Sequence, residues 1–322
     1  MSIPIRQKMA FLPEPTTGFS VTKFCSKADL RLPHEIVSLS NGTRLHIIGL
    51  SIESATNSKI LLFFHGGAYF HSAAPSHIPF AYACSQLYST PSQPAILAVL
   101  EYTLSPIAPY PRQLQQAIAS LNYVLTLTSP SNIILVGDSA GGHLAMSLLS
   151  YMLHPDVVED PSLESVQMKE NENLRGLCLI SPGLSIDLTG ASYLTNSSTD
   201  YISSDTVHDM YSNLTPPSAT LADALNIPHL SPGNAPAEHW SHLPVSETLV
   251  TIGEREVLYD SCLEFVEKLK QSGARVKLVI GEGEWHDSPI VDSMFGLKEI
   301  EGGTGQAVAD WMREMGSVDR GN

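Results

Sequence analysis

Mostly apolar runs about as long as a β-strand recur along the chain, and stretches with helical periodicity lie between them. A near-continuous apolar run is expected of a strand that is buried on both faces of a sheet. We therefore predict buried strands at the runs of this kind, which span residues 59–64, 95–100, 133–136, 177–180, 248–252 and 276–280.

The stretches between these runs carry apolar residues at helical spacing, as Leu114, Ile118 and Leu121 do. They predict helices over residues 77–88, 114–127, 143–152, 261–272 and 305–315. Two further strands, 35–39 and 44–50, are joined by Asn41-Gly42, a dipeptide typical of a tight hairpin. Strands that alternate with helices predict an α/β fold with a mostly parallel sheet and helices on both of its faces. We expect one domain over residues 1–322.

Two segments interrupt the alternation. Residues 155–173 are polar and acidic, which predicts a solvated surface loop. Residues 184–243 are rich in Ser, Thr, Asn and Pro, and a structureless loop of that length is improbable in a compact domain. We predict that this insertion and the proline-rich residues 1–33 form a helical cap. Large cap residues are expected to face a substrate: Tyr193, Tyr201, Met210, Tyr211, Leu214 and Trp240.

Composition narrows the class of partner. The chain of 322 residues is 43% hydrophobic and carries 18 basic and 33 acidic residues, so its formal net charge is −15. Such a charge repels nucleic acid and anionic lipid, which favours a small-molecule substrate. The four cysteines share no short spacing, and no apolar run is long enough for a membrane span. We therefore expect reduced cysteines and a cytoplasmic protein without a membrane span.

A G-x-S-x-G pattern lies directly after the apolar run 133–136 and before a helical pattern. It consists of Gly137, Ser139 and Gly141. A sharp turn from a strand into a helix exposes the serine oxygen, and the glycines leave room for neighbouring backbone. The pattern therefore predicts that Ser139 is a nucleophile. Asp138, beside it, is expected to brace this turn by hydrogen bonding.

A serine nucleophile needs a base and an acid that orients the base. His286 follows the last predicted strand, at the edge of the sheet where ligands gather in open α/β folds. Glu256 follows the preceding strand and is our choice of acid. Glu254 is its rival, whereas Asp260 is interpreted as a helix N-cap and Glu264 as a residue inside that helix.

Donors for a developing oxyanion are expected from His65-Gly66-Gly67-Ala68, which follows the strand predicted at 59–64. We predict that the N–H groups of Gly66, Gly67 and Ala140 point at the substrate oxygen. The remaining histidines do not have the spacing of a metal site. They recur at His65, His71 and His77 and at His229, His239 and His242. No metal or other cofactor is predicted.

Three segments together resemble the hormone-sensitive-lipase-like branch of the α/β-hydrolase fold: HGG at 65–67, GDSAGG at 137–142, and EYTLSP at 101–106 followed by PYP at 109–111. The resemblance implies an eight-stranded sheet with one antiparallel strand, a cap, and hydrolysis of carboxylic esters. It also supports Glu256, because EVLYD at 256–260 stands where the family usually has Asp-Pro-Leu-x-Asp. The chain departs from the family pattern at Glu256 and at Ala68, which replaces a frequent third glycine.

The predicted function is therefore that of a serine esterase with a Ser139–His286–Glu256 triad, acting on a small or medium-sized ester. Candidate substrate-binding residues are Tyr69, Asp138, Tyr201, Tyr211 and Trp285. One alternative is an acyltransferase, dehydratase or cyclisation enzyme of specialised (secondary) metabolism that uses the same site. Another is a small-molecule receptor, as the related gibberellin receptors are, although those lack the catalytic histidine. The sequence leaves a homodimer open.

Overall fold

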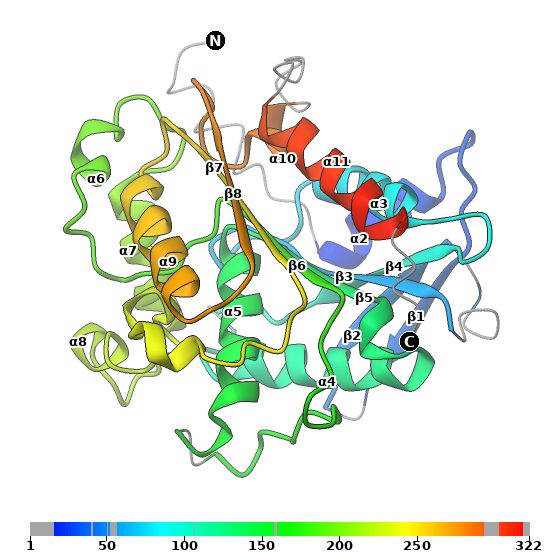
Figure 1. Ribbon diagram of the computed structural model, residues 1–322, viewed down its shortest axis with the longest axis horizontal. Helices are drawn as coiled ribbons and strands as arrows, with labels where there is room; N and C mark the ends of the chain where they lie inside the picture. The colour runs from blue at the N-terminus through cyan, green and yellow to red at the C-terminus, as the bar shows by residue number, and fades with distance from the viewer. Residues whose placement is uncertain are drawn as a thin grey trace.

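The computed structural model describes residues 16–39, 41–49, 51, 57–105, 107–157, 160–292 and 303–317. Its core is an eight-stranded sheet (Figure 1). The strands are β1 (His34–Ser38), β2 (Arg44–Ile48), β3 (Lys59–Phe64), β4 (Ala95–Glu101), β5 (Ile133–Asp138), β6 (Gly176–Ile180), β7 (Thr248–Gly253) and β8 (Val276–Gly281). Each of the predicted strands is present, with ends that differ by two residues or fewer.

The strands lie in the order β1-β2-β4-β3-β5-β6-β7-β8. Strand β2 runs antiparallel to both of its neighbours, and the pairs from β4 through β8 are parallel. The direction in which the chain crosses the sheet reverses after β4, because β4 pairs with one edge of β3 and β5 pairs with the other. In open α/β sheets a ligand site lies beyond the carboxyl ends of the strands at such a reversal. The predicted α/β-hydrolase architecture with one antiparallel strand is confirmed.

Helices cover both faces of the sheet (Figure 1). One face packs against α2 (Thr17–Cys25), α3 (His77–Tyr88) and α11 (Thr304–Ser317), and the other against α4 (Arg112–Leu127), α5 (Ala140–Leu153) and α9 (Tyr259–Gln271). The central strands β3 and β5 are buried along their whole length, as their apolar sequences require. Their alternate side chains enter the two hydrophobic clusters, so the sheet forms the middle layer of the core.

The insertion between β6 and β7 is built from short helices. They are α6 (Ser192–Thr195), α7 (Ser204–Leu214), α8 (Leu221–Ala224) and the 3-10 turns η4 (Pro232–Asn234) and η5 (Ala237–Trp240). Helix α7 begins at a capping box in which the Ser203 side chain accepts from the Thr206 N–H. Further short elements are η2 (Pro130–Asn132), η3 (Pro155–Val157) and α10 (Ser288–Val291).

Some sequence-based expectations change. Helix α5 begins at Ala140 rather than at residue 143, directly after Ser139, so the sharp turn from strand to helix predicted at Ser139 forms an elbow between β5 and α5. Asp260 is not an N-cap: it lies in the first turn of α9, and its carboxylate accepts a hydrogen bond from Ser192 N–H at 2.8 Å. Helix α2, in the predicted N-terminal lid, packs against α3 and β2. Residues 1–15 of that lid lie outside the described residues, as do residues 50, 106, 158 and 159 of other predicted segments.

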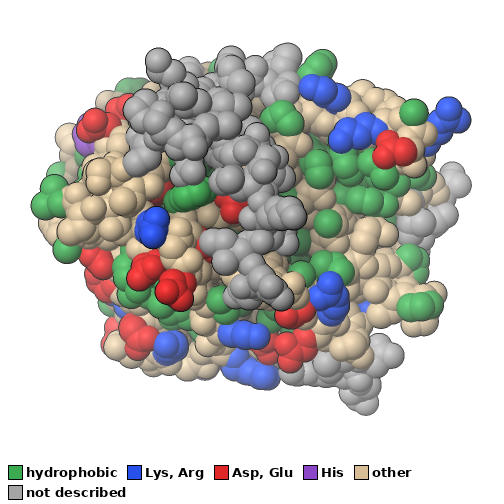
Figure 2. All heavy atoms as spheres, turned by 90° about the horizontal axis from the view of Figure 1, so that it is seen from above, with side chains coloured by type: hydrophobic (Ala, Val, Ile, Leu, Met, Phe, Trp, Pro, Cys, Tyr) green, Lys and Arg blue, Asp and Glu red, His purple; other side chains and the backbone are tan. Residues whose placement is uncertain are grey.

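The surface carries charges of both signs. On the face drawn in Figure 2, acidic and basic side chains are interspersed, and the described residues form no continuous basic area there. None of the helices in the described part of the chain is long and apolar enough to cross a membrane.

Candidate active site

Ser139 lies at a sharp turn between β5 and α5. Its backbone has φ 48° and ψ −116°, a conformation that costs a residue with a Cβ about 1 kcal/mol or more. The turn is held by backbone hydrogen bonds from Ser139 N–H to Ile180 O at 2.9 Å and from Gly183 N–H to Ser139 O at 3.1 Å. Backbone strain that the surrounding structure maintains in this way is typical of a functional position. The same conformation directs the Ser139 side chain out of the helix.

Glycines make this turn possible. A Cβ on Gly137 would collide with the backbone of Gly141, and one on Gly141 would collide with the carbonyl of Phe64. Strand β5, helix α5 and the end of β3 therefore approach more closely than residues with side chains allow. The G-x-S-x-G pattern has the structural basis that the sequence suggested.

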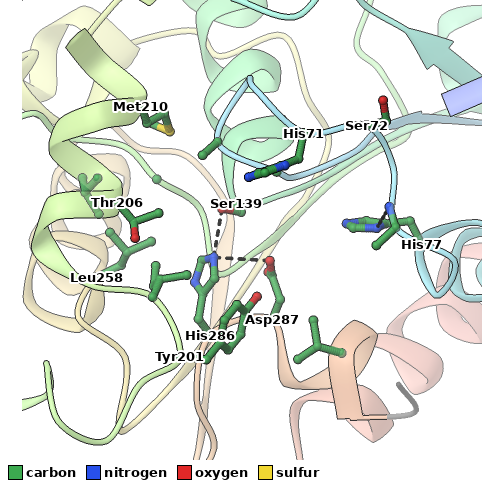
Figure 3. Close-up of a pocket in the computed structure, with 17 residues that line it drawn as sticks. His71, Ser72, His77, Ser139, Tyr201, Thr206, Met210, Leu258, His286 and Asp287 are labelled. Atoms are coloured by element: carbon green, nitrogen blue, oxygen red, sulfur yellow. Dashed lines mark hydrogen bonds and ion pairs between the residues drawn. The ribbon is translucent and has the colours of Figure 1, made fainter. Parts of the chain in front are cut away.

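The imidazole of His286 connects Ser139 to Glu256. Its Nε2 lies 2.9 Å from Ser139 Oγ, and its Nδ1 lies 2.9 Å from Glu256 Oε2. Figure 3 shows His286 pointing at Ser139 from the loop after β8. All three residues follow the carboxyl ends of their strands, β5, β7 and β8. The structure thus brings together the three side chains that the sequence analysis selected from distant segments.

The carboxylate of Glu256 is fixed by two hydrogen bonds to one of its oxygens. Its Oε1 accepts hydrogen bonds from Ser181 Oγ at 2.7 Å and from Gly253 N–H at 2.5 Å, and its side chain is fully buried. These bonds leave Oε2 for His286. The rival carboxylate, Glu254, is exposed and accepts a bond from Gly283 N–H at 3.0 Å instead.

The charge around His286 is strongly negative. Burial by itself lowers the pKa of His286, but the carboxylates of Asp287, Glu256 and Asp200 outweigh it and raise the pKa above its usual range. Asp287 Oδ2 lies 3.3 Å from Nε2, the nitrogen that also contacts Ser139. Burial raises the pKa of Asp287 well above its usual range, although the positive charge of His286 works against this. The site therefore stabilises an imidazolium.

The loop after β3 differs from the prediction in one donor. The N–H of Gly66 donates to Asp138 Oδ2 at 2.9 Å, so it is already used inside the protein. The same carboxylate oxygen lies 3.0 Å from His77 Nε2. Asp138 thus connects the loop after β3 to the turn that carries Ser139. The assignment of Gly66 as an oxyanion donor is wrong because its N–H already donates a hydrogen bond to the Asp138 carboxylate.

Three other N–H groups near Ser139 are uncommitted. Within the described part of the chain, Gly67, Ala68 and Ala140 donate no backbone hydrogen bond to a protein acceptor. Gly67 and Ala68 line the pocket beside Ser139, and Ala140 is the first residue of α5. Ala68 and Tyr69 both have left-handed φ angles, 52° and 63°, which turn this loop sharply. The first N–H groups of a helix have no intrahelical acceptor and favour negative charge.

A pocket opens directly over Ser139 (Figure 3). The loop after β3 lines one side, with His71 and Ser72 among its residues. The insertion lines the other side with Tyr201, Ile202, Thr206, Val207 and Met210. The wall formed by the insertion is therefore mostly apolar, while the ionisable groups gather near Ser139.

Only some of the predicted substrate-binding residues line this pocket. Tyr201 lines the pocket, but the other four are not among its described lining residues. Tyr69 is buried and its hydroxyl lies 2.7 Å from His143 Nδ1, while the hydroxyl of Tyr211 donates to Gly183 O at 3.0 Å. Asp138 holds Gly66, and the indole of Trp285 donates to Asp292 at 3.2 Å. These four support the walls of the site rather than its surface.

Large residues of the insertion divide in the same way. Tyr201 and Met210 line the pocket, whereas Tyr193, Tyr211, Leu214 and Trp240 do not. Trp240, for example, packs edge-on against Phe265 of α9, with ring centroids 5.5 Å apart. The insertion has a core of its own to fill, and apolar composition does not separate that core from a binding surface.

Sequence reasoning missed two buried aspartates. Asp287 contacts His286 directly, and Asp200, in the insertion, accepts a hydrogen bond from the backbone N–H of His286 at 3.1 Å. Asp287 immediately follows the predicted base, which was a usable signal. Nothing in the sequence distinguishes Asp200 from its neighbours. No group of three or more metal-ligating side chains is found among the described residues.

A second contact between serine and histidine lies further along α5. Ser150, within α5, has its Oγ 2.7 Å from His229 Nδ1 and 2.8 Å from His239 Nε2. Ser150 and His229 are fully buried, and neither residue lines the pocket over Ser139. Burial lowers the pKa of both histidines to about 4.

Comparison with known proteins agrees with this architecture. The chain belongs to the α/β-hydrolase fold family, whose model matches residues 61–289. It is 26% identical to an esterase of Acinetobacter venetianus, over 75% of this chain and 71% of that protein. It is 27% identical to carboxylesterase NlhH of Mycobacterium tuberculosis, over 69% of this chain and 64% of that protein. The chain thus spans less than two thirds of the second relative.

A solved structure with a similar fold is that of an esterase from the bacterial hormone-sensitive lipase family. It superposes with a TM-score of 0.71 at 22% identity and covers 98% of this chain and 97% of that one. The resemblance that the HGG and GDSAGG motifs indicate is confirmed by the family match and by these relatives.

Proposed function

We propose that this protein hydrolyses carboxylic esters through an acyl-enzyme on Ser139. The observation that carries the proposal is the continuous contact from Ser139 Oγ through the imidazole of His286 to Glu256, with both contacts at 2.9 Å. Support comes from the strained turn at Ser139, the pocket above it, and the relatives named esterases.

In the first half of the reaction, His286 Nε2 takes the proton of Ser139 as Oγ attacks the ester carbonyl carbon. Glu256 accepts a hydrogen bond from Nδ1–H of His286, which fixes the tautomer and stabilises the imidazolium. We assign the oxyanion to the N–H groups of Gly67, Ala68 and Ala140, because these donors are uncommitted near Ser139. The imidazolium then protonates the leaving alcohol, and the acyl group stays on Ser139.

In the second half, water attacks the acyl-enzyme. His286 takes one proton from the water, the oxyanion forms again in the same place, and the proton returns to Ser139 as the carboxylic acid leaves. The apolar lining by Ile202, Val207 and Met210 suits an acyl chain of short or medium length.

Location in the cytoplasm and homodimerisation stay predictions.

The test compares two serines. Wild-type protein, Ser139→Ala and Ser150→Ala are assayed with p-nitrophenyl acetate and p-nitrophenyl butyrate. We expect kcat to fall by about 10⁶-fold in Ser139→Ala, as for other serine nucleophiles. Ser150→Ala should stay within about twofold of wild type, because Ser150 lies outside the pocket. Undiminished turnover by Ser139→Ala would rule out the proposal.

A further inference from the structure

The insertion contributes one carboxylate to the base of the site. Asp200 is fully buried, and both of its oxygens accept hydrogen bonds from backbone N–H groups. Oδ2 accepts from Val257 at 2.9 Å, and Oδ1 accepts from His286 at 3.1 Å and from Tyr201 at 2.8 Å. A buried carboxylate is costly unless it is hydrogen-bonded, and three N–H donors compensate this one.

The three donors belong to different parts of the site. Val257 follows Glu256 on the loop after β7, and His286 is on the loop after β8. Tyr201 lines the pocket from the insertion. One side chain therefore joins the loop of the acid, the loop of the base and a residue that faces the substrate. The contact between Glu256 and His286 at 2.9 Å depends on the relative position of these two loops.

We propose that Asp200 is a positioning residue that clamps the loops of Glu256 and His286 and couples their alignment to the insertion over the pocket. This inference rests on the proposed esterase function. The insertion thus shapes the pocket and also helps to hold the catalytic geometry. A displacement of reacting groups by about 1 Å can cost 10²-fold in rate, so the clamp has a measurable consequence.

The charge of Asp200 acts on the same imidazole. Ionisable groups around it come from each adjoining element: Glu256 after β7, His286 and Asp287 after β8, Tyr201 in the insertion, and Asp138 at the elbow, which faces Asp287. Burial raises the pKa of Asp200 to about 7, against the positive charge of His286. The negative charge of Asp200 in turn raises the pKa of His286. Removal of that charge should lower the pKa of His286.

The experiment compares Asp200→Asn with Asp187→Asn in the full chain. Asp187 lies in the same insertion but is exposed, and its carboxylate accepts a local bond from Thr189 N–H at 3.0 Å. For p-nitrophenyl butyrate we expect Asp200→Asn to lower kcat by about 10²-fold, with KM within about twofold of wild type. The acid limb of kcat/KM should move to lower pH. Asp187→Asn should match wild type in all three respects.

Hydrogen exchange gives a readout that does not need activity. The amide hydrogens of Val257 and His286 should exchange faster in Asp200→Asn and at the wild-type rate in Asp187→Asn. If Asp200→Asn does not fold, Asp200→Ser is the second uncharged variant and is held to the same expectations. The shorter serine side chain leaves space for water and cannot reach both loops.

The outcomes separate the two proposals. An Asp200 variant with wild-type kcat, a loss confined to KM, or a lower kcat with an unmoved acid limb would overturn the positioning role. Wild-type exchange at both amides would overturn it too. If the wild-type protein hydrolyses no ester at all, the proposed function fails, and the exchange measurement still decides whether Asp200 clamps the two loops.

Discussion

Two serine–histidine contacts of similar length lie at opposite ends of the same helix, and the groups around them differ. Ser139, just before α5, is 2.9 Å from His286, and Ser150, inside α5, is 2.7 Å from His229. His286 has a carboxylate 2.9 Å from its other nitrogen. Among the described ion pairs, none joins His229 or His239 to a carboxylate.

The surroundings shift the pKa values of His286 and His229 in opposite directions. Carboxylates raise the pKa of His286, whereas burial lowers the pKa of His229 to about 4. A base that takes a proton from serine must hold the resulting positive charge, and only the first site stabilises it. A short distance between serine and imidazole therefore does not define a nucleophile. The carboxylate, the strained turn and the pocket distinguish Ser139 from Ser150.

The largest effect in this comparison after loss of Ser139 itself is expected from Glu256→Gln. The amide keeps nearly the same shape but has no negative charge, so it cannot stabilise the imidazolium, and its NH2 group can face Nδ1 in place of an acceptor oxygen. We expect kcat to fall by about 10⁴-fold, as when the orienting acid of other triads is made neutral. Steady-state kinetics on p-nitrophenyl butyrate measure this loss.

Glu254→Gln is the matched control, because Glu254 is exposed on the same loop. It should retain wild-type kcat. Equal losses in the two variants, or full activity of Glu256→Gln, would mean that the orienting acid is not Glu256.

A smaller loss is expected from Gly67→Ala. Gly67 has φ +112°, and an added Cβ would lie 2.8 Å from the carbonyl oxygen of His71, so the loop that carries the assigned oxyanion donors must shift. Loss of one such donor costs about 10²–10³-fold in kcat. Gly273→Ala serves as control, since Gly273 also has a positive φ, +88°, but nothing lies within 4 Å of its added Cβ. Wild-type kcat in Gly67→Ala would contradict this assignment.

The smallest effect expected is a shift of the pH profile in Asp287→Asn. The base is active only when His286 is neutral, so activity falls as the pH drops through the pKa of His286. Asp287 raises that pKa from a position 3.3 Å from Nε2. Without its charge the pKa falls, and the acid limb of kcat/KM should move to lower pH. An unmoved limb, or a shift to higher pH, would show that Asp287 does not control the charge of His286.

The sequence was sufficient for the parts of the molecule that periodicity and glycine determine. Buried strands such as β3 and β5 follow from continuous apolar runs, and the turn at Ser139 follows from the sterically required Gly137 and Gly141. The carboxyl ends of neighbouring parallel strands meet at one edge, which brought His286 and Glu256 to Ser139. The expected enzyme class, a carboxylic ester hydrolase, agrees with the relatives.

The remainder depended on distances between segments that have no regular spacing. Gly66 was chosen as a donor because the position of the Asp138 carboxylate, 2.9 Å from its N–H, cannot be inferred from sequence order. Asp200 lies in an insertion of short helices, where no periodicity indicates which residue turns inward. The same lack of periodicity hid which large residues of the insertion face the pocket and which fill its core.

Covalent labelling tests the difference between the two serines most directly. The native protein is treated with a fluorophosphonate, and the modified residue is located by mass spectrometry of its peptides. A single adduct on Ser139, absent from the Ser139→Ala variant and retained in Ser150→Ala, is the predicted result. An adduct on Ser150, or full labelling of Ser139→Ala, would contradict the account.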